Sequence, residues 1–250
     1  MALEPTLPTL QALHQAHLLA VPFENLSIHF HQPISLQQKA LYEKIVLGHR
    51  GGFCYELNGL FAWLLLSIGF QVTLLSAGVA RQDGNFGPEF DHLTLQVHHL
   101  SGADWLADVG FGDSFLLPLR LEADGEQEGG DGRVYRLLRT SQQSEKQTKP
   151  EYWVMQRWSE GRWEAQYRFT LQPHVLHDFT ERCHYQQTSP ESHFTRQRIC
   201  SLATSTGRLT LSNDRFITTT DGKREERIVE SEQEYRDVLA KWFGVVVEIT

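Results

Sequence analysis

Hydrophobic residues in the first third of the chain recur every two to four positions, which is the spacing of amphipathic helices. Such runs cover residues 9–17 and 54–68, and Gly69 follows the second run, where a glycine can end a helix in the left-handed conformation. Another helix is predicted from Ser35 to about Val46, because a glutamine three residues after the serine completes the spacing of a capping box. The first part of the chain is therefore predicted to be helical.

The hydrophobic period changes beyond this point. Hydrophobic and polar residues alternate at 93–97, which is typical of strands with one buried face. Short runs with aromatic residues continue the series at 105–111, 135–140, 152–158 and 163–169, the last two joined by a turn at 159–161. Two polar segments, 122–132 and 140–150, are predicted to be exposed loops. The middle of the chain is predicted to be an antiparallel sheet or barrel.

From residue 172 onward, strand-like runs and turns lead to a last helix. Ser231 and Glu234 have the spacing of a second capping box, and Gly244 follows Phe243 where it can end the helix. Residues 245–250 contain several β-branched side chains and predict a final strand. These elements predict a third, mixed α/β part.

Composition and charge exclude several classes of protein. The chain has 250 residues with 40% hydrophobic content, enough for a sizeable core, and a formal charge of −8 with no long basic run, which argues against a nucleic-acid-binding surface. The longest apolar run, 60–66, is too short to span a bilayer, and the first residues have no signal-peptide pattern, so we expect no membrane contact and a cytoplasmic location. Three cysteines are too few for a disulfide framework, and an odd number leaves at least one free thiol.

One of these cysteines, Cys54, is predicted to lie in the first turn of a helix. The positive end of a helix favours a thiolate, which is the nucleophilic form of cysteine. Gly51 and Gly52 would leave the sulfur unshielded, and Arg50 would add positive charge. A buried cysteine is more often a small apolar residue, but this position favours a nucleophile.

A nucleophilic cysteine needs a base, and twelve histidines are available. His92 is the best placed, because it stands at the start of a predicted strand and directly after a loop. His98 has the same strand parity but lies deeper in the strand, and His99 is expected to point to the apolar side. The most plausible carboxylate partner is Asp108, an acid among apolar residues in the next strand, although capping a turn would explain it equally well.

His92 and Asp108 can interact only if the predicted hairpin that joins their strands places both side chains on the same face. The two residues are 108 − 92 = 16 positions apart, and a plain four-residue loop over 101–104 would place them on opposite faces. A loop with an odd number of residues, or a bulge, would bring them to one face. We therefore predict one of these, with a carboxylate-to-ring distance of about 2.6 to 3.2 Å.

Four segments carry a resemblance to a known family. VPFENLSI, RGGFCYELNGLF, DHLTLQV and WLADVGFG, in this order, closely resemble the arylamine N-acetyltransferase family, and the similarity covers nearly the whole chain. The resemblance implies that Cys54 accepts the acyl group, that His92 is its base and that Asp108 orients the histidine. It also implies that Thr94, Phe111, Gly112 and Val79 line the cleft for substrate and coenzyme. The chain departs from the family in having His49 where an arginine is common, and in lacking the inserted loop of the vertebrate enzymes.

The same resemblance implies an α+β fold with a core like those of cysteine proteases and transglutaminases. Its expected parts are an N-terminal helical domain (1–75), a central antiparallel β-barrel (76–171) and a C-terminal α/β lid (172–250). The implied reaction is N-acetylation of arylamines and arylhydrazines by a ping-pong route, with acetyl-CoA as co-substrate and no metal.

Other interpretations of the sequence remain open. A thiol hydrolase or a transglutaminase would share the order Cys, His, Asp, and a binding module could keep the fold without the chemistry. The glycines at 110 and 112 lack the third glycine of a dinucleotide loop. Zinc ligation by two cysteines at 183 and 200 and two histidines at 184 and 193 lacks the usual ligand spacing.

Overall fold

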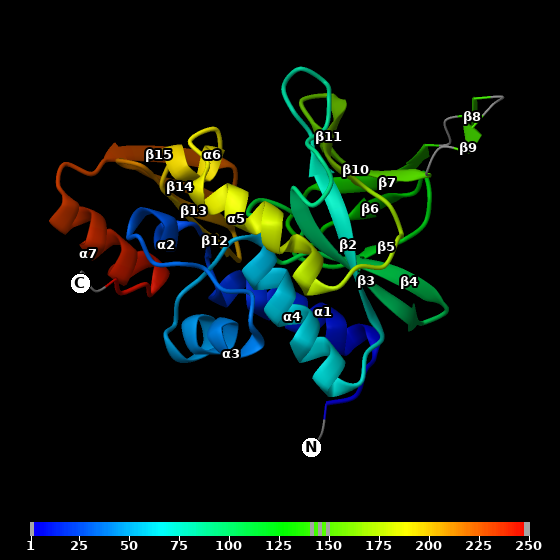
Figure 1. Ribbon diagram of the computed structural model, residues 1–250. Helices are drawn as coiled ribbons and strands as arrows, with labels where there is room; N and C mark the ends of the chain where they lie inside the picture. The colour runs from blue at the N-terminus through cyan, green and yellow to red at the C-terminus, as the bar shows by residue number, and fades with distance from the viewer. Residues whose placement is uncertain (1–2, 141–142, 145–146, 149–150, 248–250) are drawn as a thin grey trace.

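The computed structural model describes residues 3–140, 143–144, 147–148 and 151–247. The fold is α+β, with helices from the first part of the chain on one side of a barrel-like sheet and a second sheet beside them (Figure 1). No helix in these ranges is long and apolar enough to cross a membrane.

The first part of the chain is helical, as predicted. Its elements are α1 (Leu7–Ala20), α2 (Leu26–His29), α3 (Gln38–Leu41), the π-helical segment Tyr42–Leu47 and α4 (Cys54–Ile68). Gly69 ends α4 with a φ of 107°, in the left-handed region that favours glycine. The capping box predicted at Ser35 is wrong, because the serine hydroxyl accepts from the Gln37 amide in a turn and the helix begins only at Gln38.

The central sheet is an almost closed antiparallel barrel. Its strand order is β5-β4-β3-β2-β11-β10-β7-β6. The strands are β2 (Val72–Val79), β3 (His92–Leu100), β4 (Ala103–Ala107), β5 (Leu119–Arg120), β6 (Glu126–Glu128), β7 (Val134–Thr140), β10 (Tyr152–Ser159) and β11 (Arg162–Phe169). The Gln127 side chain donates to the Arg120 carbonyl at 2.9 Å and accepts from its amide at 2.6 Å, so the two edge strands are linked through a side chain.

Two segments predicted as loops contain strands. The segment 122–132 includes β6, which pairs with β7. The segment 140–150 includes the short pair β8 (Gln143–Ser144) and β9 (Gln147–Thr148), and the rest of it, apart from Thr140 at the end of β7, lies outside the described residues. Polar composition was misleading at β6 because an edge strand keeps its polar side chains in solvent.

Strand β3 is buried on both faces from His92 to Val97, whereas alternation predicted one exposed face. One face packs with α4 in a cluster that includes Leu95, Val97 and Phe61. The other face is turned toward the barrel interior, where buried polar side chains such as Thr94 and Gln96 lie. Polar residues here line an enclosed site and do not mark a solvent face.

The predicted irregularity in the β3–β4 hairpin is confirmed. Val97 pairs with Trp105 but Leu100 pairs with Ala103, so the register shifts by one residue between them. The turn has two residues, with φ of 54° at Ser101 and 77° at Gly102. His99 belongs to this bulge and is exposed, so the prediction that it points to the apolar side is wrong.

The second sheet has five antiparallel strands: four form a meander near the end of the chain, and the fifth, β1, comes from its start. Its order is β1-β12-β13-β14-β15, and the bounds are β1 (Phe23–Glu24), β12 (Ile199–Thr204), β13 (Gly207–Ser212), β14 (Arg215–Thr220) and β15 (Lys223–Ile228). Two short helices, α5 (Thr180–Thr188) and α6 (His193–Arg196), precede it, and α7 (Glu232–Phe243) follows it. The division of the chain at residues 75 and 171 stays a prediction.

The ends of α7 agree with the prediction, but the final strand does not. The Ser231 hydroxyl accepts from the Glu234 amide at 3.2 Å, and Gly244 has a φ of 66°. Residues 245–247 are not in a strand, because Val245 packs into the apolar cluster between α7 and the second sheet. Residues 248–250 lie outside the described residues.

Candidate active site

Cys54 is the first residue of α4 and is buried. The two glycines before it have a different function from the predicted one. A Cβ on Gly51 would overlap the Pro22 carbonyl oxygen, and a Cβ on Gly52 would lie 2.7 Å from a carboxylate oxygen of Glu56. The glycines therefore allow the chain to pass close to its neighbours at the start of α4, and they do not serve to expose the sulfur.

Arg50 does not supply its charge to the thiol. Its guanidinium lies 2.8 Å from the buried Glu24 carboxylate and also donates to the Ser27 hydroxyl. The interpretation of Arg50 as an activating charge is therefore wrong, because a buried carboxylate neutralises it. The ion pair links β1 to the segment that leads into α4.

The second candidate residue, His92, lies beside the third, Asp108. Nε2 of His92 is 2.7 Å from Oδ2 of Asp108, inside the predicted range, and both side chains are almost fully buried. His92 is the first residue of β3 and Asp108 directly follows β4. The bulge between the two strands gives both residues the same side of the sheet.

Asp108 is held by three groups besides His92. The Asn58 side chain and the Gly110 amide donate to Oδ1 at 2.9 and 3.0 Å, and the Asp108 amide donates to Nε2 of His14 at 3.0 Å. Neither Asn58 nor His14 was predicted from the sequence. No local pattern marked them, since His14 is 94 residues from its partner and both lie on helices with ordinary apolar spacing.

Burial and hydrogen bonding act on the two ionisable groups in opposite directions. Burial raises the pKa of the Cys54 thiol well above its usual value, and a hydrogen bond from the Leu93 backbone opposes this only in part. Burial also tends to raise the pKa of the Asp108 carboxyl, but the His92 ring and the Asn58 amide hold that pKa below its usual value. Burial therefore opposes ionisation of the Cys54 thiol, whereas the contacts of Asp108 favour its ionised carboxylate.

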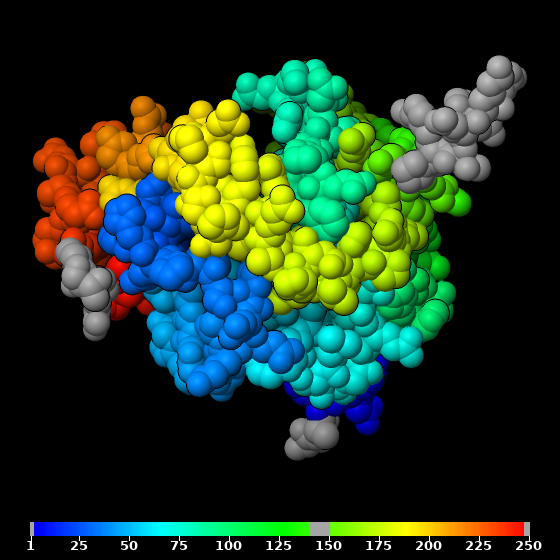
Figure 2. All heavy atoms as spheres, viewed as in Figure 1, coloured from blue at the N-terminus to red at the C-terminus, as the bar shows by residue number. Residues whose placement is uncertain are grey.

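Cys54 and His92 line one cavity of about 500 Å³. Val79 and Phe111 line it as predicted, together with Phe23, Gly110 and residues of α5 and α6. In Figure 2 the surface is hollowed between the yellow α5–α6 region and the teal segment that follows β2. The site is therefore reached from a surface that the second half of the chain helps to build.

Two other predicted cleft residues lie near this cavity but are not among its described lining residues. Thr94 is buried next to the His92–Asp108 pair, and its hydroxyl donates to the Ala107 carbonyl at 3.3 Å. Gly112 has a φ of 91°, and its carbonyl accepts from the Arg208 guanidinium. Both residues shape the walls behind the cavity.

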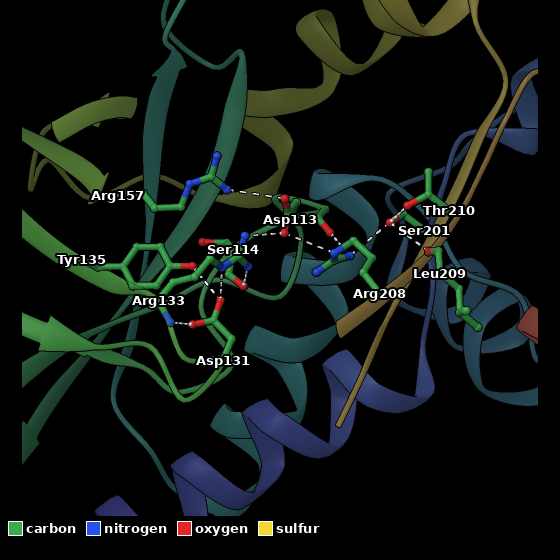
Figure 3. A network of polar contacts seen from close by, with 11 residues as sticks. Asp113, Ser114, Asp131, Arg133, Tyr135, Arg157, Ser201, Arg208, Leu209 and Thr210 are labelled. Atoms are coloured by element: carbon green, nitrogen blue, oxygen red, sulfur yellow. Dashed lines mark hydrogen bonds and ion pairs between the residues drawn. The ribbon is translucent and has the colours of Figure 1, made fainter. Parts of the chain in front are cut away.

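A network around Asp113 joins this wall to the second sheet (Figure 3). The Asp113 carboxylate lies 2.8 Å from Arg133, 3.4 Å from Arg157 and 3.2 Å from Arg208. Arg208 comes from β13, Arg157 lies in β10 of the barrel, and Arg133 directly precedes β7. The network therefore anchors the loop after Asp108 between the two sheets.

The segment before His92 is also constrained. Phe90 has a φ of 62°, which is strained for an aromatic residue. Its amide donates to the Ser76 hydroxyl at 2.6 Å and its carbonyl accepts from the Tyr55 hydroxyl at 2.8 Å. The next residue, Asp91, accepts from Arg182 of α5 at 2.5 and 3.1 Å. These contacts fix the backbone from which the imidazole projects.

The other two cysteines lie apart from the cavity. Cys183 is buried on α5, where its sulfur accepts from Gln187, and Cys200 is buried in β12. All three cysteines are free. The described ranges hold no group of three or more His, Cys, Asp or Glu side chains placed to bind a metal ion.

The fold first defines a class: α+β proteins with a core of the cysteine-protease and transglutaminase type. The sequence model of a family described as N-acetyltransferase matches residues 6–250. Arylamine N-acetyltransferase 2 of Mus musculus is 33% identical over 97% of this chain and 88% of its own length. The chain belongs to the arylamine N-acetyltransferase family.

Solved structures agree with this assignment. The arylamine N-acetyltransferase of Salmonella typhimurium superposes with a TM-score of 0.88 at 32% identity, covering 99% of this chain and 87% of that one. The Mycobacterium marinum enzyme in complex with CoA superposes with a TM-score of 0.85 at 30% identity, covering 97% and 88%. The fold is thus shared with these enzymes over nearly the whole of each chain.

Proposed function

We propose that the protein transfers the acetyl group of acetyl-CoA to arylamines and arylhydrazines by a ping-pong route through an acetylated Cys54. The main support for the proposal is that Cys54 and His92 line the same cavity, and that His92 is hydrogen-bonded to Asp108. Three free thiols fit a reducing cytoplasm, where we place the reaction.

The first half-reaction forms a new thioester. Because burial disfavours the free thiolate, the thiol proton passes to His92 as Cys54 Sγ attacks the thioester carbonyl. The bond from the acetyl carbon to the coenzyme sulfur breaks, and the coenzyme thiolate takes the proton from His92 as it leaves. One thioester replaces another, so the step is nearly balanced in energy and reversible.

The second half-reaction releases the product. The amine nitrogen attacks the acetyl carbon on Cys54, the C–S bond breaks, and the amine proton passes through His92 to the sulfur. Asp108 occupies Nε2 of the ring, so Nδ1 is the nitrogen left for these transfers. The aspartate favours the protonated ring that forms in each half-reaction.

Intact-mass spectrometry after mixing with acetyl-CoA, without an amine, tests the proposal. We expect one added acetyl group, which a later addition of an arylamine removes. Cys54→Ala should abolish the adduct, whereas Cys183→Ser should keep it, because Cys183 lies outside the cavity lining. An adduct that persists in Cys54→Ala would refute the assignment. Peptide hydrolysis or isopeptide formation without CoA would favour a thiol hydrolase or a transglutaminase.

A further inference from the structure

We infer that Arg81 and Arg196 hold the phosphate groups of the acyl donor at the mouth of the cavity. The inference rests on the proposed function, because it takes the donor to be a CoA thioester. No residue motif identified these positions, since the two arginines are far apart in the sequence and neither lies in a phosphate-binding loop.

The cavity is more positive than the chain that surrounds it. The chain has 23 basic and 31 acidic residues, a charge of −8 that would repel a polyanionic coenzyme. Among the residues that line the cavity, basic side chains outnumber acidic ones, with three arginines (81, 182 and 196) and two acids (91 and 191). A local excess of cations in an acidic protein is the expected feature of a site for a phosphorylated ligand.

Two of the three arginines are available to a ligand. Arg182 is paired with Asp91, at 2.5 Å from Nη2 to Oδ1. Within the described parts of the chain, Arg81 and Arg196 form no ion pair. The Arg196 guanidinium is nevertheless oriented, because Nε and Nη2 each donate to a backbone carbonyl just before α6 at 3.2 Å. This leaves Nη1 of Arg196 without a contact to those carbonyls.

The two residues line the cavity from different parts of the fold. Arg81 follows the end of β2, and Arg196 is the last residue of α6 (Figure 1). Both are exposed, whereas Cys54 is buried in the same cavity. A CoA thioester has the same arrangement, with its phosphates separated from the reacting carbonyl by the pantetheine arm. Guanidinium groups match phosphate oxygens in two-point hydrogen bonding, so the exposed pair suits the phosphates and the buried thiol suits the thioester.

A comparison of two acyl donors distinguishes phosphate binding by the two arginines from a general effect of the substitutions on the enzyme. Acetyl-CoA carries the phosphates, and S-acetylpantetheine has the same thioester and arm without them. We expect Arg81→Gln and Arg196→Gln each to raise KM for acetyl-CoA about tenfold, and the double variant about 100-fold. With S-acetylpantetheine, kcat/KM should stay within about twofold of the wild type. Arg139→Gln, which changes the same charge on the exposed surface of β7, should leave both donors unaffected.

Equal losses with both donors, or an unchanged KM for acetyl-CoA in the double variant, would overturn the inference. Calorimetric binding of CoA to the wild type and to the double variant needs no turnover and separates the two proposals. Weaker binding by the double variant, in a protein that transfers no acetyl group, would support the phosphate contacts and refute the proposed function. Acetyl transfer through Cys54, with CoA binding unchanged in the double variant, would support the proposed function and refute the phosphate contacts.

Discussion

Replacing Asp108 by asparagine should impose the wrong proton arrangement on His92 while preserving the shape of the site. Oδ1 of Asp108 accepts from two donors, the Asn58 amide and the Gly110 N–H. In Asp108→Asn, only the amide oxygen can take that position, because an NH2 group there would face two donors. The NH2 group must then occupy the Oδ2 position, 2.7 Å from Nε2 of His92.

This geometry decides the tautomer of the histidine. Facing an N–H donor, Nε2 must accept, so the proton moves to Nδ1 and the ring can no longer take the proton of Cys54. The same substitution in the triad of a serine protease lowers kcat about 10⁴-fold. We expect about 10³- to 10⁴-fold here, which corresponds to about 4 to 5.5 kcal/mol of activation free energy.

Single-turnover formation of the acetyl-enzyme, followed by rapid quenching and mass spectrometry, measures this loss without the amine step. Asp104→Asn is a matched control, because Asp104 bonds Gln96 and lies next to His98 at the other end of the hairpin. That control should react within about threefold of the wild type. An Asp108→Asn enzyme that retains more than a tenth of the wild-type rate would refute the tautomer argument.

Two further predictions concern the histidines. Because burial opposes ionisation of Cys54, alkylation of this residue by iodoacetamide at pH 7 should depend on His92 as a base. His92→Gln should therefore slow the alkylation at least tenfold. Equal alkylation rates for the two proteins would contradict a base at this position. The pKa of His14 is lowered to about 4 by burial, so between pH 6.5 and pH 4 the unfolded chain binds a proton that the folded chain does not, and stability falls as the pH falls. Between pH 7 and pH 5 this proton uptake lowers the free energy of unfolding by about 2 kcal/mol. In urea titrations, the free energy of unfolding of His14→Gln should fall by about 2 kcal/mol less than that of the wild type over the same pH range. Equal falls in both proteins would exclude His14 as the cause.

Local signals in the sequence predicted those parts of the fold that local interactions determine. The helix ends at Gly69 and Ser231 follow from backbone conformation and side-chain capping within a few residues. The bulge between β3 and β4 followed from requiring His92 and Asp108 to share a face. Each of these inferences used residues within about 16 positions of one another.

The surroundings of the site could not be predicted in this way. Arg50 looked like a free charge until Glu24, 26 residues away, was found beside it. His14 reaches Asp108 across 94 residues, and Arg182 reaches Asp91 across 91. Tertiary packing alone brings these groups together, so neither spacing nor composition indicated them.

Strand β1 has a consequence for the order in which the protein can be completed during synthesis. Phe23 and Glu24 pair with residues 200–201 on one side and bridge to Gly52 on the other. Strand β1, which lies beside the backbone that leads to Cys54, therefore gains its second neighbour only after about four-fifths of the chain has been synthesised. Until then the nascent chain contains Cys54 but lacks the β1–β12 pairing beside it, so the site is completed late in synthesis.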